Sequence, residues 1–126
     1  MADIAYIDDN MDCLEIVKTA FNELGLSLDI YDDPVQFYNT KKQYKLIISD
    51  FYMPDINGQD FIKLIKEKDP RVKTILYTGA IEEIKDLIEM RTEFDSFLQK
   101  PLDFESLTKV VKFLLYEYDN QNRSFV

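Results

Sequence analysis

Three aspartates follow apolar segments that have the length and composition of buried strands. Asp8 and Asp9 come directly after the run Ile4–Ile7, and Asp50 comes directly after Leu46–Ser49. If both runs are parallel strands, their carboxyl ends meet at one edge of a sheet, where ligands bind in open α/β folds. Clustered carboxylates repel one another unless a cation such as Mg²⁺ neutralises them. The aspartates therefore predict a divalent-cation site, and a carboxylate beside such a cation can accept a phosphoryl group.

Two further polar residues follow the later strand-like runs. Thr78 comes after Thr74–Tyr77, and Lys100 comes shortly after Ser96–Leu98. A threonine hydroxyl and a lysine ammonium both bind phosphoryl oxygens, and Lys100 could also pair with Asp50. Each of these residues alone is commonly a turn or capping residue. Their position at the same ends of different strands favours a phosphoryl-transfer site over a set of ordinary turns.

Apolar runs alternate with amphipathic stretches along the chain. The strand-like runs are Ile4–Ile7, Leu28–Tyr31, Leu46–Ser49, Thr74–Tyr77 and Ser96–Leu98. Apolar residues at helical spacing define the faces of three helices: Leu14, Val17, Phe21 and Leu24 in the first, Phe61, Leu64 and Ile65 in the third, and Ile81, Ile84, Leu87 and Ile88 in the fourth. A short second helix begins at Pro34 and a fifth begins at Asp103. This alternation predicts a single α/β domain with a parallel sheet covered on both faces.

The composition limits the classes of function. The chain has 126 residues, which fits one domain, and 46% of them are hydrophobic, which suffices for a core. The net charge of -9 disfavours direct binding to nucleic acid or to anionic membranes. The absence of histidine excludes a phosphohistidine on this chain, and the single Cys13 excludes an internal disulfide. With no signal peptide or membrane-length apolar run, we expect a cytoplasmic protein.

The ordered set of polar residues resembles the receiver domain of two-component response regulators over residues 3–118. The matching residues are Asp8-Asp9, Asp50, Met53-Pro54, Gly58, Thr78-Gly79 and Lys100-Pro101. The resemblance implies a flavodoxin-like α/β fold, a doubly wound five-stranded parallel sheet of the (βα)5 type with strand order 2-1-3-4-5. It also implies a receiver domain over residues 1–118 and a polar tail over residues 119–126. Because no effector domain follows residue 118 in this sequence, we expect either a receiver of the stand-alone, single-domain type or one domain of a longer protein.

The resemblance implies a phosphoacceptor with a metal ion beside it. Asp50 would accept a phosphoryl group from a phosphohistidine on a partner histidine kinase or phosphotransfer protein. Asp8, Asp9 and Asp50 would bind Mg²⁺, or Mn²⁺ in its place, and the backbone carbonyl of Tyr52 would complete the protein ligands. The domain would catalyse only its own phosphorylation and slow dephosphorylation, so it would not be a conventional enzyme.

The resemblance also implies a switch. Thr78 and Lys100 would hold the phosphoryl oxygens, and Thr78 and Phe97 would change the surface of helix four, strand five and helix five on phosphorylation. Phe97 lacks the hydroxyl of tyrosine, so switching would depend on burial of its ring. The Lys100-Pro101 peptide is expected in the cis form. A downstream protein, which the sequence does not identify, would bind the changed surface of a monomer or weak dimer.

Two other classes of function share parts of this pattern. A pseudo-receiver would bind partners without being phosphorylated, but every residue needed for the chemistry is present here. An aspartyl-phosphate phosphatase on a related α/β fold would carry a second aspartate two residues after its nucleophile, where this chain has Tyr52. The sequence therefore favours a phosphorylatable signalling domain over both alternatives.

Overall fold

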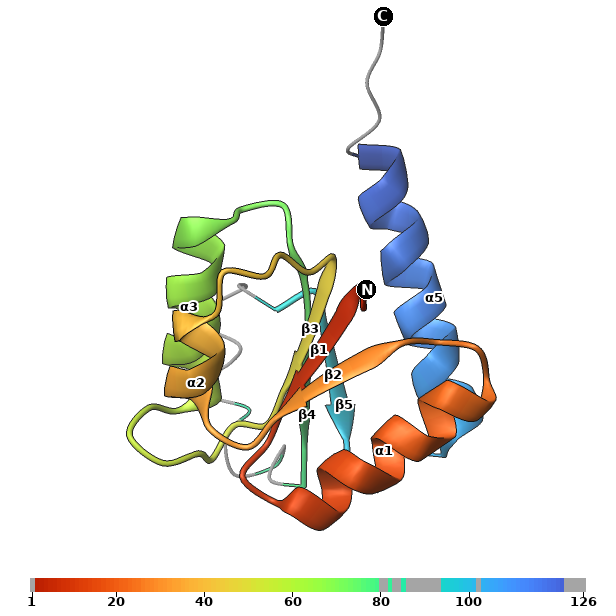
Figure 1. Cartoon of the computed structure of the whole chain (residues 1–126), viewed down its shortest axis with the longest axis horizontal. Helices are drawn as coiled ribbons and strands as arrows, with labels where there is room; N and C mark the ends of the chain where they lie inside the picture. The colour runs from red at the N-terminus through yellow and green to blue at the C-terminus, as the bar shows by residue number, and fades with distance from the viewer. Residues whose placement is uncertain (1, 80–81, 83–84, 86–93, 102, 122–126) are drawn as a thin grey trace, which may run out of the picture.

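The structure, a computed structural model, describes residues 2–79, 82, 85, 94–101 and 103–121 (Figure 1). Its elements in chain order are β1 (Ile4–Ile7), α1 (Met11–Glu23), β2 (Leu28–Tyr31), α2 (Pro34–Asn39), β3 (Leu46–Ser49), α3 (Gly58–Lys68), β4 (Lys73–Thr78), β5 (Ser96–Gln99) and α5 (Phe104–Gln121). The face expected for the fourth helix, Ile81, Ile84, Leu87 and Ile88, lies outside the described residues. All five predicted strands are present, with small differences at their ends.

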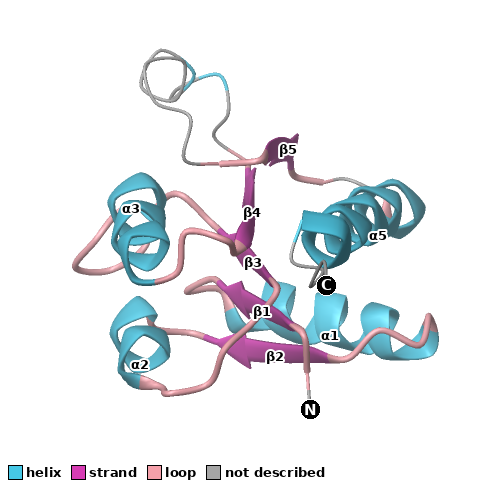
Figure 2. Cartoon of the chain, turned by 90° about the horizontal axis from the view of Figure 1, so that it is seen from above, coloured by secondary structure: helices cyan, strands magenta, loops and turns pink. Residues whose placement is uncertain are grey.

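The five strands form one parallel sheet in the order β2-β1-β3-β4-β5, which confirms the predicted topology. Helices α1 and α5 cover one face of the sheet, and α2 and α3 cover the other (Figure 2). The chain passes from β1 outwards to β2 and then returns across β1 to β3, so the direction of winding reverses there. Open α/β sheets bind ligands beyond the carboxyl ends of the strands at such a reversal.

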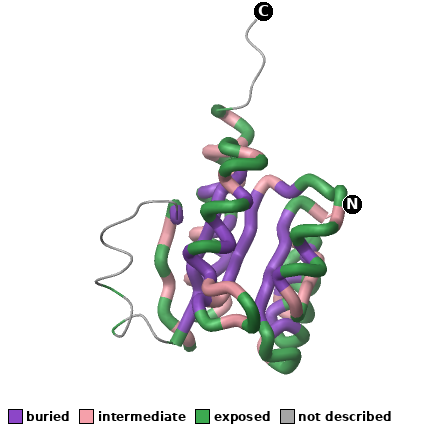
Figure 3. Tube along the Cα trace, turned by 90° about the vertical axis from the view of Figure 1, so that its left-hand side faces the viewer, coloured by how far each residue is buried: buried purple, intermediate pink, exposed green. Residues whose placement is uncertain are grey.

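The central strands are buried on both faces. Every residue of β1, β3 and β4 is buried (Figure 3). Phe37 and Phe61 belong to the apolar cluster on the α2–α3 face, and Phe21 and Leu107 belong to the cluster on the α1–α5 face. Because both faces are covered, β1, β3 and the middle of β4 are apolar runs rather than alternating ones, and Lys73, Thr74 and Thr78 of β4 are polar residues that are also buried.

Two residues expected on buried helix faces are exposed instead. The exposed fraction is 50% for Leu24 and 40% for Leu64. Leu24 is the C-cap of α1, where the helix ends before Gly25, whose φ is 77°. Leu64 lies about 100° around α3 from Ile65, which is buried, so Leu64 falls outside the buried stripe. These two assignments from the apolar spacing are therefore wrong.

The last helix extends beyond the expected domain boundary at residue 118. Helix α5 continues to Gln121, and the Asp119 carboxylate accepts a hydrogen bond of 2.8 Å from Lys45 Nζ. This contact joins the end of α5 to the loop before β3. The division into a domain over residues 1–118 and a tail over residues 119–126 stays a prediction. Within the described part of the chain, no helix combines the length and apolar character needed to cross a membrane.

Candidate functional site

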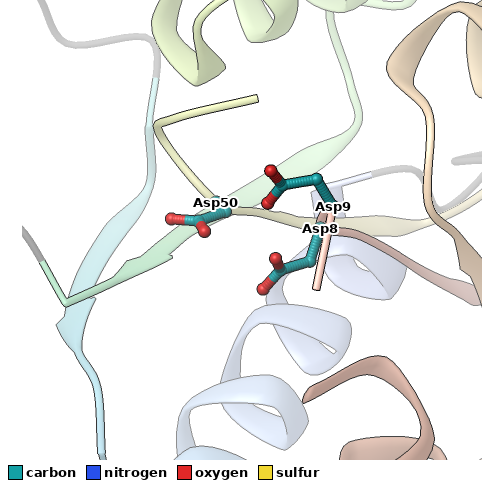
Figure 4. A group of neighbouring side chains, drawn as sticks. All are labelled: Asp8, Asp9 and Asp50. Atoms are coloured by element: carbon teal, nitrogen blue, oxygen red, sulfur yellow. The ribbon is translucent and has the colours of Figure 1, made fainter. Parts of the chain in front are cut away.

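The carboxyl ends of β1 and β3 bring Asp8, Asp9 and Asp50 together (Figure 4). One carboxylate oxygen from each residue lies within 4.8 Å of the other two. The two strands pair in register up to Ile7 and Ser49, and the Asp50 N–H donates to the Ile7 carbonyl at 3.0 Å. Residues that follow the two strands are therefore neighbours. The structure brings the three predicted carboxylates together, and their roles stay predictions.

Lys100 reaches this cluster from the end of β5. Its Nζ lies 2.5 Å from Asp8 Oδ2 and 3.4 Å from Asp50 Oδ2, so the closer partner is Asp8 rather than Asp50. Burial lowers the pKa of Lys100, but the hydrogen bond to Asp8 and the charges of Asp8 and Asp50 outweigh it, so the pKa is raised. The Lys100-Pro101 peptide is cis, as expected. Lys100 therefore stays charged between the two carboxylates.

The Asp50 carboxylate is oriented by groups from three parts of the chain. The Phe51 N–H donates to Asp50 Oδ1 at 2.7 Å, and Lys100 lies beside Oδ2. Thr78, the buried last residue of β4, also hydrogen-bonds to Asp50 through its side chain. Burial raises the pKa of Asp50, while the charge of Lys100 and the hydrogen bond from Thr78 oppose this rise. These contacts hold the carboxylate in one orientation at the mouth of the site.

Tyr6 is a part of the site that the sequence analysis missed. It is fully buried in β1, and its hydroxyl donates to Asp8 Oδ2 at 2.7 Å. Burial raises the pKa of Tyr6, and the charge of Asp8 raises it further, so the hydroxyl remains a donor. Asp8 Oδ1, the other carboxylate oxygen, accepts a hydrogen bond of 2.9 Å from the Asn10 backbone N–H. The sequence contained a signal for this contact: Tyr6 and Asp8 are two residues apart, and residues two apart in a strand point to the same face of the sheet.

Tyr77 also belongs to the surroundings of the site. Its ring centroid lies 5.4 Å from Lys100 Nζ and 6.2 Å from the centroid of Tyr6. A cation at this distance from an aromatic ring is attracted to it. The lysine is therefore held by a carboxylate on one element and flanked by a ring from the neighbouring strand β4.

Ser49 and Gly58 fix the loop that follows the phosphoacceptor candidate. Ser49 Oγ donates to the Asp50 carbonyl at 2.8 Å, and the Gly58 N–H donates to the Phe51 carbonyl at 2.6 Å. A Cβ at Gly58 would lie 2.2 Å from the Asp50 carbonyl oxygen and 2.9 Å from Phe51 Cα. Only glycine allows the start of α3 to approach Asp50 this closely.

A family profile matches most of the chain. The profile of the response regulator receiver domain matches residues 4–112. The chain is a receiver domain of this family. It is 28% identical over 113 residues to the transcriptional regulatory protein CusR of Escherichia coli strain K12, an alignment that covers 86% of this chain and 49% of CusR. The receiver spans about half the length of the curated relatives that it matches first.

Solved structures agree with this assignment. A CheY-like response regulator receiver domain protein from Methanospirillum hungatei JF-1 has a TM-score of 0.87 at 19% identity, over 97% of this chain and 99% of that chain. This match supports the fold alone. The response regulator protein TrrA from Thermotoga maritima, solved in complex with Mg²⁺-BeF, has a TM-score of 0.81 at 28% identity, over 90% of this chain and 99% of that chain.

The donor set of this receiver domain fits a hard divalent cation. Carboxylate oxygens are the ligands that Mg²⁺ prefers. Both oxygens of the buried Asp8 already accept hydrogen bonds, one from Asn10 and one shared by Tyr6 and Lys100. Asp9 is exposed, and within the described residues no hydrogen bond engages its carboxylate. Asp9 therefore has the most accessible oxygens for a metal ion.

The two remaining predicted residues lie nearer the surface of the receiver. Tyr52, two residues after Asp50, is 53% exposed, and its carbonyl as a metal ligand stays a prediction. Phe97 in β5 is 39% exposed, and its ring centroid lies 5.7 Å from that of Phe94. Its ring is thus only partly buried, and its part in a switch also stays a prediction.

Proposed function

We propose that this receiver domain accepts a phosphoryl group on Asp50 from a phosphohistidine of a partner histidine kinase or phosphotransfer protein. An oxygen of the Asp50 carboxylate forms the new bond to phosphorus while the phosphorus–nitrogen bond breaks. The electron pair of that bond returns to the imidazole, which leaves as a neutral ring when its other nitrogen is protonated. The products are an acyl phosphate on Asp50 and a free histidine on the partner.

One observation supports this proposal most. Asp50 lies at the switch point of the sheet with two more carboxylates, the ammonium of Lys100 and the side chain of Thr78 around it. Phosphoryl transfer depends on positioning and on neutralising charge rather than on further covalent chemistry. Lys100 and Thr78 supply donors for phosphoryl oxygens. A bound Mg²⁺ or Mn²⁺ would supply further neutralisation, and its proposed ligands are Asp8, Asp9, Asp50 and the carbonyl of Tyr52.

The proposed output is a changed surface around β5. A phosphoryl group gives the Thr78 hydroxyl a new acceptor, and movement of Thr78 would leave room beside β5 for the ring of Phe97. Phe97 is 39% exposed, so burying the residue would remove up to about 80 Å² from water, worth about 2 kcal/mol. That free energy shifts the equilibrium between an exposed and a buried Phe97 ring about thirtyfold. A phenylalanine could therefore change the surface around β5 on phosphorylation without the hydroxyl of a tyrosine.

We further propose that the receiver acts in the cytoplasm and that a protein reads its phosphorylated surface. The net charge of -9 argues against direct contact of the receiver with nucleic acid. The domain over residues 1–118, followed by a tail over residues 119–126, would act as a monomer or weak dimer.

Phosphorylation by acetyl phosphate with Mg²⁺ tests the proposal, with intact mass as the measurement. The wild type should gain one phosphoryl group, and Asp50→Asn should gain none. Asp55→Asn is the matched control: Asp55 lies in the same loop, is exposed and has a φ of 70°, which asparagine also tolerates. A folded wild type that remains unlabelled would favour the pseudo-receiver instead. An Asp50→Asn variant labelled as fully as the control would show that another residue accepts the phosphoryl group, and would refute the assignment to Asp50.

A further inference from the structure

A cationic pole lies at the end of the sheet opposite the acidic site of this receiver. Residues 41–45, in the loop before β3, and residues 63–73, from α3 to the start of β4, hold more than half of the 15 lysine and arginine residues. They are Lys41, Lys42, Lys45, Lys63, Lys66, Lys68, Arg71 and Lys73. The two segments are adjacent, because the Lys73 N–H donates to the Lys45 carbonyl at 2.9 Å. A chain with a net charge of -9 therefore carries a cationic pole at the amino-terminal ends of β3 and β4.

Part of this charge is available to a partner. Lys66 pairs with Asp95 at 3.2 Å and Lys45 pairs with Asp119 at 2.8 Å, so the charges of these two lysines are neutralised within the domain. Lys41 and Lys68 are exposed, and no acidic side chain in the described part of the chain pairs with either of them.

Lys41 and Lys68 lie beside a cavity between α2, the loop before β3 and α3. The cavity has a volume of about 270 Å³. Its apolar floor consists of Phe37, Tyr44, Ile47, Ile65 and Val72, which are all buried, and its rim carries Lys41, Lys42 and Lys68 together with Asp69. Lys42 lies 3.5 Å from Asp29, and Asp69 lies 3.7 Å from Arg71, so the lysines leave the rim with a net positive charge. The cavity therefore combines an apolar interior with a positively charged opening.

Contacts within the wall keep the cavity in this shape. The Tyr44 hydroxyl donates to Asp29 at 2.6 Å and lies 2.6 Å from the Tyr31 hydroxyl, so the polar end of this floor residue is satisfied. Lys68 Nζ lies 4.7 Å from the centroid of the Tyr38 ring and donates to the Tyr38 carbonyl at 3.3 Å. The stem of Lys68 is thereby held against α2 as one side of the opening.

The size and charge of the cavity define its occupant. A dry apolar cavity of about 150 Å³ holds one benzene, whereas drug-sized ligands occupy about 300–1,000 Å³. A volume of about 270 Å³ suits one aromatic or large aliphatic side chain better than a complete cofactor. The lysine rim favours carboxylates on either side of that side chain.

We propose that this cavity binds an acidic segment of a partner protein, with one large apolar side chain inside and flanking Asp or Glu carboxylates on Lys41, Lys42 and Lys68. The site lies at the opposite edge of the sheet from Asp50, so the receiver can bind this segment while its phosphorylation site remains accessible. The proposal does not depend on whether Asp50 is phosphorylated.

Fluorescence titration with synthetic peptides tests the proposal, because the receiver contains no tryptophan. The probes are short peptides of Glu and Asp around a central Trp, with Trp→Ser and all-Lys versions as peptide controls. The double variant Lys41→Glu/Lys68→Glu reverses two rim charges. The double variant Lys18→Glu/Lys112→Glu reverses two exposed charges on α1 and α5 and is the matched control.

Binding of the acidic Trp peptide should shift its emission to the blue, and the rim variant should weaken this binding at least tenfold. The matched control should bind within twofold of wild type, and the all-Lys peptide should bind at least tenfold more weakly. The Trp→Ser peptide, added as a competitor, should need at least tenfold higher concentration than a Trp→Phe peptide to displace the acidic Trp peptide. The proposal is overturned if no acidic Trp peptide binds the folded wild type, or if both double variants lose affinity equally. It is also overturned if an RNA oligonucleotide or anionic vesicles displace the acidic Trp peptide as effectively as the Trp→Phe peptide does.

Discussion

Replacing Gly58 by alanine places a methyl group where the backbone leaves no room for one. The new Cβ would lie 2.2 Å from the Asp50 carbonyl oxygen, whereas ordinary contact begins at 3.4 Å. The two backbone segments must therefore separate by about 1 Å. They are also tied by the 2.6 Å hydrogen bond from the Gly58 N–H to the Phe51 carbonyl, so separation weakens that bond too. We expect Gly58→Ala to lower the free energy of unfolding by about 2–3 kcal/mol.

The same displacement moves the proposed phosphoacceptor. A misplacement of about 1 Å in a reacting group reduces a rate by up to about 100-fold. We expect the rate of Asp50 phosphorylation by acetyl phosphate, measured by intact mass at saturating Mg²⁺, to fall about 10–100-fold in Gly58→Ala. Urea unfolding followed by circular dichroism measures the stability of the same sample, so loss of fold and loss of positioning can be told apart.

Gly79→Ala is the matched control for this prediction. Gly79 also follows a strand at the same edge of the sheet, but a Cβ there meets no atom of the described residues within 4 Å. Its stability should remain within about 0.5 kcal/mol of wild type, and its phosphorylation rate within about threefold. The reasoning about close approach is refuted if Gly58→Ala retains both stability and rate, or if both alanine variants lose them equally.

Three further predictions concern the site itself. Mg²⁺ at about 100 times its dissociation constant should raise the free energy of unfolding by about 2.7 kcal/mol, and EDTA should reverse this; an equal gain in Asp9→Asn would mean that the cation binds elsewhere. Tyr6→Phe removes a buried hydrogen bond to a carboxylate and should cost about 1.5–3 kcal/mol in urea unfolding, whereas an unchanged midpoint would contradict the role assigned to that hydroxyl. Tyr52→Asn should speed loss of the acyl phosphate, because the tyrosine ring is expected to shield it from water; equal rates of dephosphorylation would show that it does not.

The strands of this receiver could be predicted from the positions of apolar residues along the chain. The strand runs Ile4–Ile7, Leu28–Tyr31 and Leu46–Ser49 have the same bounds in the sequence prediction and in the structure. The apolar character of Ile4–Ile7 and Leu46–Ser49 follows from burial on both faces, whereas Leu28–Tyr31 contains Asp29 and is buried only at Leu28. Helix faces were predicted less well, since Leu24 and Leu64 fit the apolar spacing but lie at a helix end and outside the buried stripe.

The sequence by itself determined the fold class and the members of the acidic cluster. The reason is topological, because residues that follow parallel strands meet at one edge whatever the details of packing. Asp8, Asp9 and Asp50 could therefore be brought together from their positions alone.

Tertiary structure decided which groups touch. It placed Lys100 closer to Asp8 than to Asp50, turned the Tyr6 hydroxyl into a partner of Asp8, and brought Gly58 against the Asp50 backbone. It also closed a lysine-rimmed cavity from segments that are about 25 residues apart in sequence. Such contacts depend on side-chain rotamers and on how helices pack against the sheet, and neither is fixed by the spacing of residues along one chain.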